Sequence, residues 1–533
     1  MSATATPWSV NSWRSKPAKQ QVDYEDKACF AKTVKTIQQL PPLISKGEVT
    51  ELRRQLAEVA AGKRFLLQGG DCAERFMDCN SSAIEQKLKI MLQMSLVLTW
   101  GARMPTVRVA RMAGQYAKPR SSPTEIIEGK QYFSFRGDNI NGFELKDRKP
   151  DPERLLQGYF HSASTLNYAR ALIKDGFADV RAAKHWNLGF VKSSENRAKY
   201  EKMVRSIREA SEFVEVCGLS DLDRLKTVDL FVCHEALHLD YEEAMTRQIG
   251  TQETPVPATV AASSSFSSSS SSSSSSTTAA PPQQKQSFMN LGAHFIWIGD
   301  RTRQLDHAHV EYMRGVENPI GLKVGPTTKP DELVEIIETL CPDIRNQPGK
   351  VTLITRFGAN KVVALLPPLI KVVQEAGLQG KVIWCCDAMH GNTRSVMVGE
   401  GTPEQKKYKT RSFDDVLGEL RSTFEVHLNC GSRLGGTHLE MTGESVTECT
   451  GGPEELSSED LPMRYTSYCD PRLNYAQSLE IAFMVAEYIK FGAPLSRRPS
   501  ENNLKGMAAT AEGSNNKPAA KRRKVGDYVV LSR

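Results

Sequence analysis

Eight short apolar runs recur along the chain, and segments with helical periodicity separate most of them. The runs span 65–69, 107–113, 229–233, 294–299, 320–325, 351–355, 381–386 and 436–441. Several are almost continuously apolar, which is typical of parallel strands buried on both faces. Strands that alternate with helices favour an α/β fold. Eight of them predict a (β/α)8 TIM barrel, here with an N-terminal extension and added helices.

Helical periodicity fills most of the gaps between these runs. The expected helices span 83–99, 153–173, 304–315, 330–340, 362–376, 413–428 and 476–490. Pro330 followed by acidic residues is typical of a first helical turn, where the helix dipole favours negative charge. Between the third and fourth runs the pattern is irregular, with only a short helical stretch at about 239–249.

Two segments lack the apolar residues that a folded core needs. Residues 251–287 include ten consecutive serines at 267–276, and residues 496–533 are rich in Asn, Gly, Ala and Lys. Such compositions cannot offset the entropy of ordering the chain. We therefore expect an N-terminal extension over 1–60 and a catalytic barrel over 61–495. A disordered serine-rich insert at 251–287 interrupts the barrel, and a disordered basic tail follows at 496–533.

The net charge of +7 does not indicate a nucleic-acid partner. Nine basic and three acidic residues lie from Ser496 onward, so the tail alone contributes +6. No uncharged apolar run is long enough for a bilayer, and the first residues lack the apolar stretch of an export signal. We expect a cytoplasmic protein without a membrane partner. The run Lys521-Arg522-Arg523-Lys524 resembles a nuclear-localisation patch, with a solvated basic tail as the alternative.

Basic side chains follow most of the predicted strands, at the end where barrel enzymes carry their active sites. They are Arg111, Lys118, Arg120, Arg301, Lys323 and Arg356. A single arginine after a strand is more often part of a surface ion pair. Together they indicate anionic ligands, because guanidinium groups match phosphate and carboxylate. We therefore predict small phosphorylated substrates, and more than one of them.

Metal-ligating residue types end three of the predicted strands. Cys72, His390 and Glu440 follow strands one, seven and eight, which are neighbours once a barrel closes. Asp470 in a later loop could supply a fourth ligand. A mixed sulfur, nitrogen and oxygen set suits Mn, Fe, Co or Zn better than Mg or Ca. For Cys72 a buried core thiol is the alternative, and for His390 a hydrogen-bonded structural histidine.

The segment His234-Glu235-Ala-Leu-His238 has the HExxH pattern of zinc proteases. That pattern needs a helix, which places both histidines on one face. Here it directly follows a strand-like run. His234 and Glu235 are therefore better interpreted as a polar pair at a strand end, lining the site.

Longer motifs carry a family resemblance. They are LLQGGDCAERF (66–76), RMAGQYAKPRS (111–121), CHEALHLDYE (233–242), HFIWIGDRTRQLDHAHVEYMRGVENPIGLKVGP (294–326), DAMHGNT (387–393), GGTHLEMTGESVTECTGG (435–452) and CDPRLNYAQSLE (469–480). The chain resembles class-II 3-deoxy-D-arabino-heptulosonate 7-phosphate (DAHP) synthases from about residue 8 to residue 492. The resemblance implies a metal-dependent transferase that condenses phosphoenolpyruvate with erythrose 4-phosphate. That reaction is the first step of the shikimate pathway to chorismate and the aromatic amino acids.

Matched motif by motif, the resemblance also implies roles for residues. The metal ligands are Cys72, His390, Glu440 and Asp470. The phosphoenolpyruvate contacts are Arg111, Asp300, Arg301, Lys323 and Arg356. The erythrose 4-phosphate contacts are Lys118, Arg120 and Ser121, and the catalytic residues are Lys323, Arg356 and His390. The implied cofactor is one divalent metal, Mn²⁺ before Co²⁺, Fe²⁺ or Zn²⁺. The implied partners are the two substrates, further copies of the chain in a homodimer or homotetramer, and an aromatic amino-acid feedback inhibitor.

Four positions depart from the family pattern. Asp300 stands where Glu is usual, His307 where Gly is usual, Ala388 where Pro is usual, and His238 replaces an apolar residue. Two alternatives follow: a paralogue of a specialised pathway that uses an altered substrate such as an amino analogue, or a non-catalytic regulatory relative. The retained metal-ligand and cationic sets favour an active enzyme.

Overall fold

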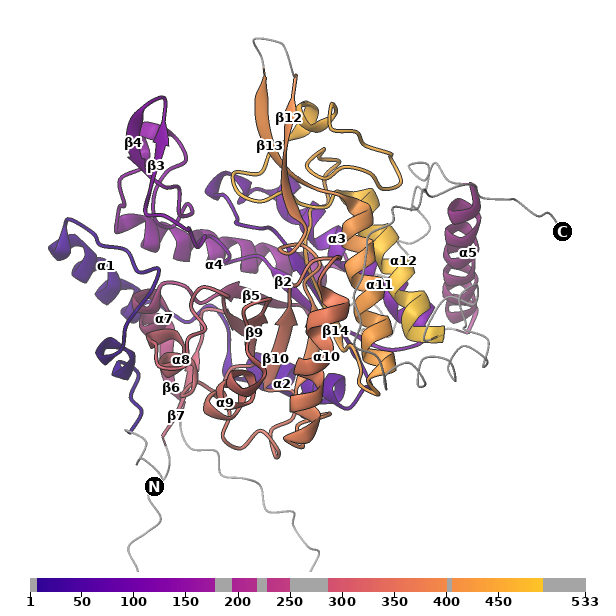
Figure 1. The fold of residues 1–533 in the computed structure, drawn as a ribbon, viewed down its shortest axis with the longest axis horizontal. Helices are drawn as coiled ribbons and strands as arrows, with labels where there is room; N and C mark the ends of the chain where they lie inside the picture. The colour runs from indigo at the N-terminus through magenta and orange to yellow at the C-terminus, as the bar shows by residue number, and fades with distance from the viewer. Residues whose placement is uncertain (1–6, 178–193, 218–227, 250–285, 400–404, 492–533) are drawn as a thin grey trace, which may run out of the picture. The chain divides into compact units, whose positions relative to one another are not determined.

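A computed structural model describes residues 7–177, 194–217, 228–249, 286–399 and 405–491 (Figure 1). Nearly all of the predicted serine-rich insert and the whole predicted basic tail lie outside these residues. Ser287, which the sequence placed in the insert, begins strand β7. Across the described residues, no helix is both long enough and apolar enough to cross a bilayer.

Eight parallel strands close into a barrel in the order β1-β14-β11-β10-β9-β8-β5-β2. They are β1 (Phe65–Gly70), β2 (Thr106–Arg111), β5 (Phe231–Glu235), β8 (Phe295–Ile298), β9 (Ile320–Val324), β10 (Val351–Thr355), β11 (Ile383–Cys386) and β14 (Gly436–Glu440). Each coincides with a predicted run, so the predicted TIM barrel is confirmed. The first and last barrel strands pair in register, with Gly70 beside Glu440.

Helices surround the barrel, as Figure 1 shows. The predicted ones are α3 (Ser81–Ala102), α4 (Glu153–Lys174), α8 (Ala308–Met313), α9 (Pro330–Leu340), α10 (Val362–Glu375), α11 (Phe413–Asn429) and α12 (Tyr475–Phe491). Four others had no predicted counterpart or only a partial one: α1 (Lys27–Gln39), α2 (Lys46–Ala60), α5 (Ser194–Val216) and α7 (Leu239–Met245). The stretch predicted as helical at 239–249 is helical only to Met245, because residues 246–249 pair as a strand.

Within the described residues, three antiparallel strand pairs lie outside the barrel, and none was predicted. They pair β3 (Thr124–Ile127) with β4 (Lys130–Phe133), β6 (Thr246–Ile249) with β7 (Ser287–Asn290), and β12 (Thr393–Val398) with β13 (Lys406–Arg411). The β6–β7 pair brackets the serine-rich segment, since Ile249 lies opposite Ser287.

The core has two layers, because side chains alternate across each strand. The inner layer includes Val109, Phe295 and Trp297 and is completed by Leu52 and Leu56 of α2. Helix α2 therefore closes the barrel interior near the N-terminal ends of the strands. A capping box between Ser45 and Glu48 fixes its start.

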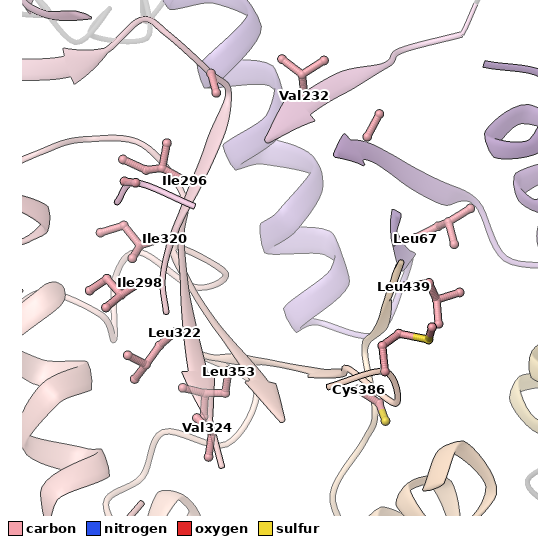
Figure 2. Close-up of a cluster of buried hydrophobic side chains, with 14 of the residues drawn as sticks. Leu67, Val232, Ile296, Ile298, Ile320, Leu322, Val324, Leu353, Cys386 and Leu439 are labelled. Atoms are coloured by element: carbon pink, nitrogen blue, oxygen red, sulfur yellow. The ribbon is translucent and has the colours of Figure 1, made fainter. Parts of the chain in front are cut away.

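The outer layer packs the strands against the surrounding helices. Figure 2 shows part of it, with Leu67, Leu322 and Leu439 among the labelled side chains. The inner positions nearest the C-terminal ends of the strands are polar instead. Arg111, Lys323 and Glu440 are all buried there. A site for charged ligands is thus built into the barrel mouth.

Candidate active site

A cavity of about 400 Å³ opens at the C-terminal ends of the barrel strands. Every residue that the family resemblance assigned to the metal, to a substrate or to catalysis lines it, except Glu440. Glu440 ends β14 and contacts two of the lining side chains, Arg111 and His390. The strand-end positions read from the sequence therefore converge in space.

Three of the four predicted metal ligands form a compact group. Ligand atoms of Cys72, Glu440 and Asp470 lie within 4.8 Å of one another. The fourth, His390, adjoins the group, since its Nε2 is 3.1 Å from Oε1 of Glu440. Within the described residues no other group of His, Cys, Asp and Glu comes together in this way. The thiolate, carboxylate and imidazole donors fit one borderline divalent ion.

Lys118 lies against two of these candidate ligands. Its Nζ is 2.9 Å from the Sγ of Cys72 and 2.6 Å from Oδ2 of Asp470. Burial opposes the charge of this lysine, but the neighbouring Asp470 and Cys72 raise its pKa well above the usual value. Burial also works against ionisation of Asp470, yet Lys118 and other cations hold the pKa of that carboxyl far below its usual range.

Glu440 is held by three cationic or imidazole partners although it is fully buried. Oε1 accepts from Arg111 at 3.2 Å and lies beside His390, while Oε2 accepts from Arg411 at 2.7 Å. Burial alone would favour the neutral acid. His390, Arg411 and Lys118 nevertheless keep the pKa of Glu440 well below its usual range. The carboxylate is thus ready to act as a ligand.

Arg411 was missed by the sequence analysis. It ends β13, in the run Lys-Lys-Tyr-Lys-Thr-Arg, which has no apolar signal and follows no barrel strand. Its guanidinium is fully buried and also donates to the carbonyl oxygens of Met389 and Pro471. The β12–β13 hairpin therefore supplies a positioning group for Glu440.

Asp387 links two of the predicted catalytic residues. Its Oδ2 accepts from Nζ of Lys323 at 2.5 Å and lies 2.8 Å from Nδ1 of His390. Burial disfavours its charge, but His390 and Lys323 lower the pKa of Asp387 well below the usual range. Nε2 of His390 is the nitrogen directed toward Glu440 and the metal-ligand group. This partner orients the histidine in the way that ligating histidines commonly require.

Asp300, one of the departures from the family pattern, is engaged by two arginines. It accepts from Nη1 of Arg356 at 2.7 Å and from Nε of Arg303 at 3.2 Å. The shorter side chain therefore still orients Arg356. Arg301 donates to the hydroxyl of Ser121 at 3.2 Å, which joins the two predicted substrate-binding sets.

The N-terminal extension reaches the cavity wall at Arg120. The Gln20 side chain accepts from the Arg120 N–H at 3.0 Å and donates to the Arg120 carbonyl oxygen at 2.9 Å. Gln20 adopts a left-handed conformation, with φ of 63°. A distant segment thus fixes the backbone of a predicted substrate-binding residue, and no sequence motif indicated this.

His234 and Glu235 end β5, as the sequence suggested, but only Glu235 lines the active-site cavity. His234 turns away and pairs with Glu242 at 2.9 Å. His238 lies just before α7 rather than on the helix, so the residues of the HExxH pattern do not share a helical face. The protease interpretation is therefore wrong for this segment.

Comparison with known proteins identifies a family for the chain. Residues 8–486 match the Class-II DAHP synthetase family. A "Phospho-2-dehydro-3-deoxyheptonate aldolase" of Neurospora crassa is 48% identical over 497 residues, covering 92% of this chain and 97% of that protein. A relative of the same name from Streptomyces coelicolor is 43% identical, covering 91% and 98% respectively. A third, "Phospho-2-dehydro-3-deoxyheptonate aldolase AroG" of Mycolicibacterium smegmatis, is 44% identical, covering 90% and 94%.

Proposed function

The chain is an enzyme of the class-II DAHP synthetase family, and from that premise we propose that its barrel mouth condenses phosphoenolpyruvate with D-erythrose 4-phosphate and water. The products are DAHP and phosphate, and the reaction is the first step of the shikimate pathway. One observation carries the proposal: the basic side chains and the candidate metal ligands converge on one cavity of about 400 Å³. That volume is in the range of small-molecule sites.

Phosphoenolpyruvate would bind to the buried cations on one side of this cavity. Arg111 and Lys323 are buried at the strand ends, and Arg356 and Arg301 lie at the rim. Asp300 orients Arg356, and Asp387 orients Lys323. Guanidinium and ammonium groups that are already fixed bind phosphate and carboxylate with little loss of side-chain entropy.

Erythrose 4-phosphate would bind on the Lys118-Pro119-Arg120-Ser121 side of the cavity. Lys118 lies beside the metal-ligand group, and Arg120 and Ser121 lie farther out. The Arg301–Ser121 hydrogen bond brings the two substrate sides together. Holding two anions close together against their repulsion converts a bimolecular step into a nearly unimolecular one, which is a large part of the catalysis.

Cys72, His390, Glu440 and Asp470 would hold one divalent metal, with Mn²⁺ as the first candidate and Co²⁺, Fe²⁺ or Zn²⁺ as alternatives. When bound there, such a metal supplies Lewis acidity at the aldehyde oxygen of erythrose 4-phosphate. Arg411 and Asp387 keep two of these ligands, Glu440 and His390, in place.

The test is a substrate-loss assay on the purified full-length chain. Loss of phosphoenolpyruvate and release of phosphate are followed with erythrose 4-phosphate and Mn²⁺, before and after chelation. We expect the phosphoenolpyruvate consumed to equal the phosphate released. Turnover should be lost with chelator and recovered when Mn²⁺ is added. Arg356→Met should lower kcat/KM for phosphoenolpyruvate at least about 100-fold, because charge-assisted bonds are lost. Arg345→Met, a surface arginine paired with Glu338, is the matched control. No turnover with any of the four metals would refute the proposal.

A further inference from the structure

A second, much smaller cavity lies behind the wall of the active site. Its volume is about 10 Å³, and its lining includes Asn139, His234, His238 and Glu242. Glu235 lines this cavity and the active-site cavity as well. A space of this size holds about one water molecule. Glu235 therefore stands between the barrel mouth and a separate buried compartment.

The small cavity is lined by polar groups that lack partners. Four of its residues carry a buried side-chain atom without a hydrogen bond: Oδ1 of Asn139, Nδ1 of His234, Oε1 of Glu235 and Nε2 of His238. Leaving such an atom unpaired is destabilising. A bound water commonly satisfies two to four groups of this kind. The cavity therefore has the size and the polar lining that a bridging water requires.

Glu235 also faces the reacting side of the barrel. A Cβ atom at Gly299, which lines the active-site cavity, would come within 2.0 Å of its Oε1. Its backbone N–H donates to the Gln115 side chain, which fixes the strand end. Burial raises the pKa of Glu235, while four surrounding cationic groups oppose that shift: Lys118, Lys323, His390 and Arg111. One buried carboxyl thus lies among cationic groups at the edge of the site.

The wall of the small cavity also holds a buried histidine–carboxylate pair. Nε2 of His234 lies 2.9 Å from Oε1 of Glu242, which leaves Nδ1 of His234 free. That nitrogen points toward Gly114, another lining residue, where a Cβ would lie 3.0 Å away. Burial lowers the pKa of His234, but the Glu242 carboxylate outweighs it and raises the pKa.

We propose that Glu235 is the general base for the water that attacks C2 of the phosphoenolpyruvate-derived cation, and that the small cavity carries its proton to the His234–Glu242 pair. The inference rests on the proposed function. When the water oxygen bonds to C2, one O–H bond breaks and that proton goes to Glu235. The second water proton leaves with phosphate when the bond between C2 and the bridging phosphate oxygen breaks and the ketone forms. The His234–Glu242 pair returns its proton to solvent before the next turnover, and the former aldehyde oxygen takes one proton from solvent. The protons therefore balance, and no oxidant or reductant is needed.

The first experiment separates proton transfer from binding. Glu235→Gln keeps the side-chain shape but cannot take a proton. We expect kcat to fall at least about 100-fold, as for the loss of a general base, while the KM for phosphoenolpyruvate changes less than about threefold. Glu235→Asp should keep at least about tenfold more activity than Glu235→Gln. Added formate should restore activity to Glu235→Ala at least about tenfold, because a small carboxylate can replace the missing base.

The second experiment tests the relay. His238→Leu should enlarge the solvent deuterium effect on kcat about twofold or more, because a relay group is lost. His427→Leu is the matched control, since His427 is also a buried histidine with an unpaired Nε2 but packs against Trp384, away from the active-site cavity. Equal activity of Glu235→Gln and Glu235→Asp, or no formate rescue, would overturn the proposal for Glu235. Equal isotope effects in His238→Leu and His427→Leu would overturn the relay. If the unmodified chain makes no DAHP, the proposed function itself fails instead.

Discussion

Replacing Arg411 with Met should destabilise the protein far more than the same change at Arg54. Both arginines pair with carboxylates, but Arg411 is fully buried beside Glu440, whereas the Arg54 side chain is 53% exposed beside Glu51 and Glu58. The change at Arg411 leaves Oε2 of Glu440 without its partner and also unpairs the carbonyl oxygens of Met389 and Pro471. The two substitutions differ mainly in burial.

The expected magnitude follows from that difference. Removing one partner of a buried ion pair costs about 3–5 kcal/mol, whereas an exposed pair contributes about 0–1 kcal/mol. With an unfolding entropy of about 2.1 cal/mol/K per residue over roughly 400 folded residues, the Arg411 change should lower the melting temperature by about 4–6 °C. The Arg54 change should lower it by about 1 °C or less.

The assay is thermal unfolding of both variants in the presence of chelator, together with titration of Mn²⁺ into each. Because Arg411 positions a candidate ligand, Arg411→Met should also weaken metal binding about 10–100-fold, and Arg54→Met should not. Equal melting temperatures in the two variants would refute the stability argument. Unchanged metal affinity in Arg411→Met would refute the positioning role.

Three further predictions concern other parts of the site and its support. Cys72→Ser should abolish Mn²⁺ binding and turnover while the melting temperature with chelator stays within about 2 °C; near-normal activity would mean that the thiol is no ligand. Gln20→Ala should raise the KM for erythrose 4-phosphate about 3–10-fold and leave that for phosphoenolpyruvate unchanged, because two bonds to the Arg120 backbone are lost; equal changes in both KM values would contradict it. Burial raises the pKa of Glu419 from 4.5 to about 7. Between these pH values the folded protein keeps this carboxyl protonated, whereas the unfolded chain has lost that proton. The free energy of unfolding should therefore fall by on the order of 3 kcal/mol as the pH rises from about 4.5 to 7, and urea titrations of Glu419→Gln should show a flatter dependence than the unmodified chain.

The barrel strands were predictable because burial on both faces leaves a continuous apolar run, as in Ile320–Val324. Cys72, His390 and Glu440 could be grouped for a related reason, since closing a barrel makes its first, seventh and eighth strands adjacent. The β12–β13 hairpin was not predicted because its strands are largely exposed and lack a continuous apolar run.

Other parts of the site depend on tertiary contacts that the sequence does not reveal. The sequence around Arg411 is typical of a solvent-exposed surface strand. Only the burial of Arg411 against Glu440 shows its role. The same is true of Gln20, whose hydrogen bonds join residues a hundred positions apart. Residues that act by supporting others carry no local pattern, whereas strand-end residues are marked by the strand before them.

The pairing of β1 with β14 also has a consequence for how the chain folds during synthesis. His438 bonds Gln68 across 370 residues of sequence, and Leu66 lies in register with Gly436. The barrel cannot close until β14 has left the ribosome. One edge of β1 therefore stays unpaired during most of translation. Apolar side chains of α2 and of the early strands remain exposed to other chains in that interval. Late closure makes this a slow-folding topology that depends on protection of its first-made segments.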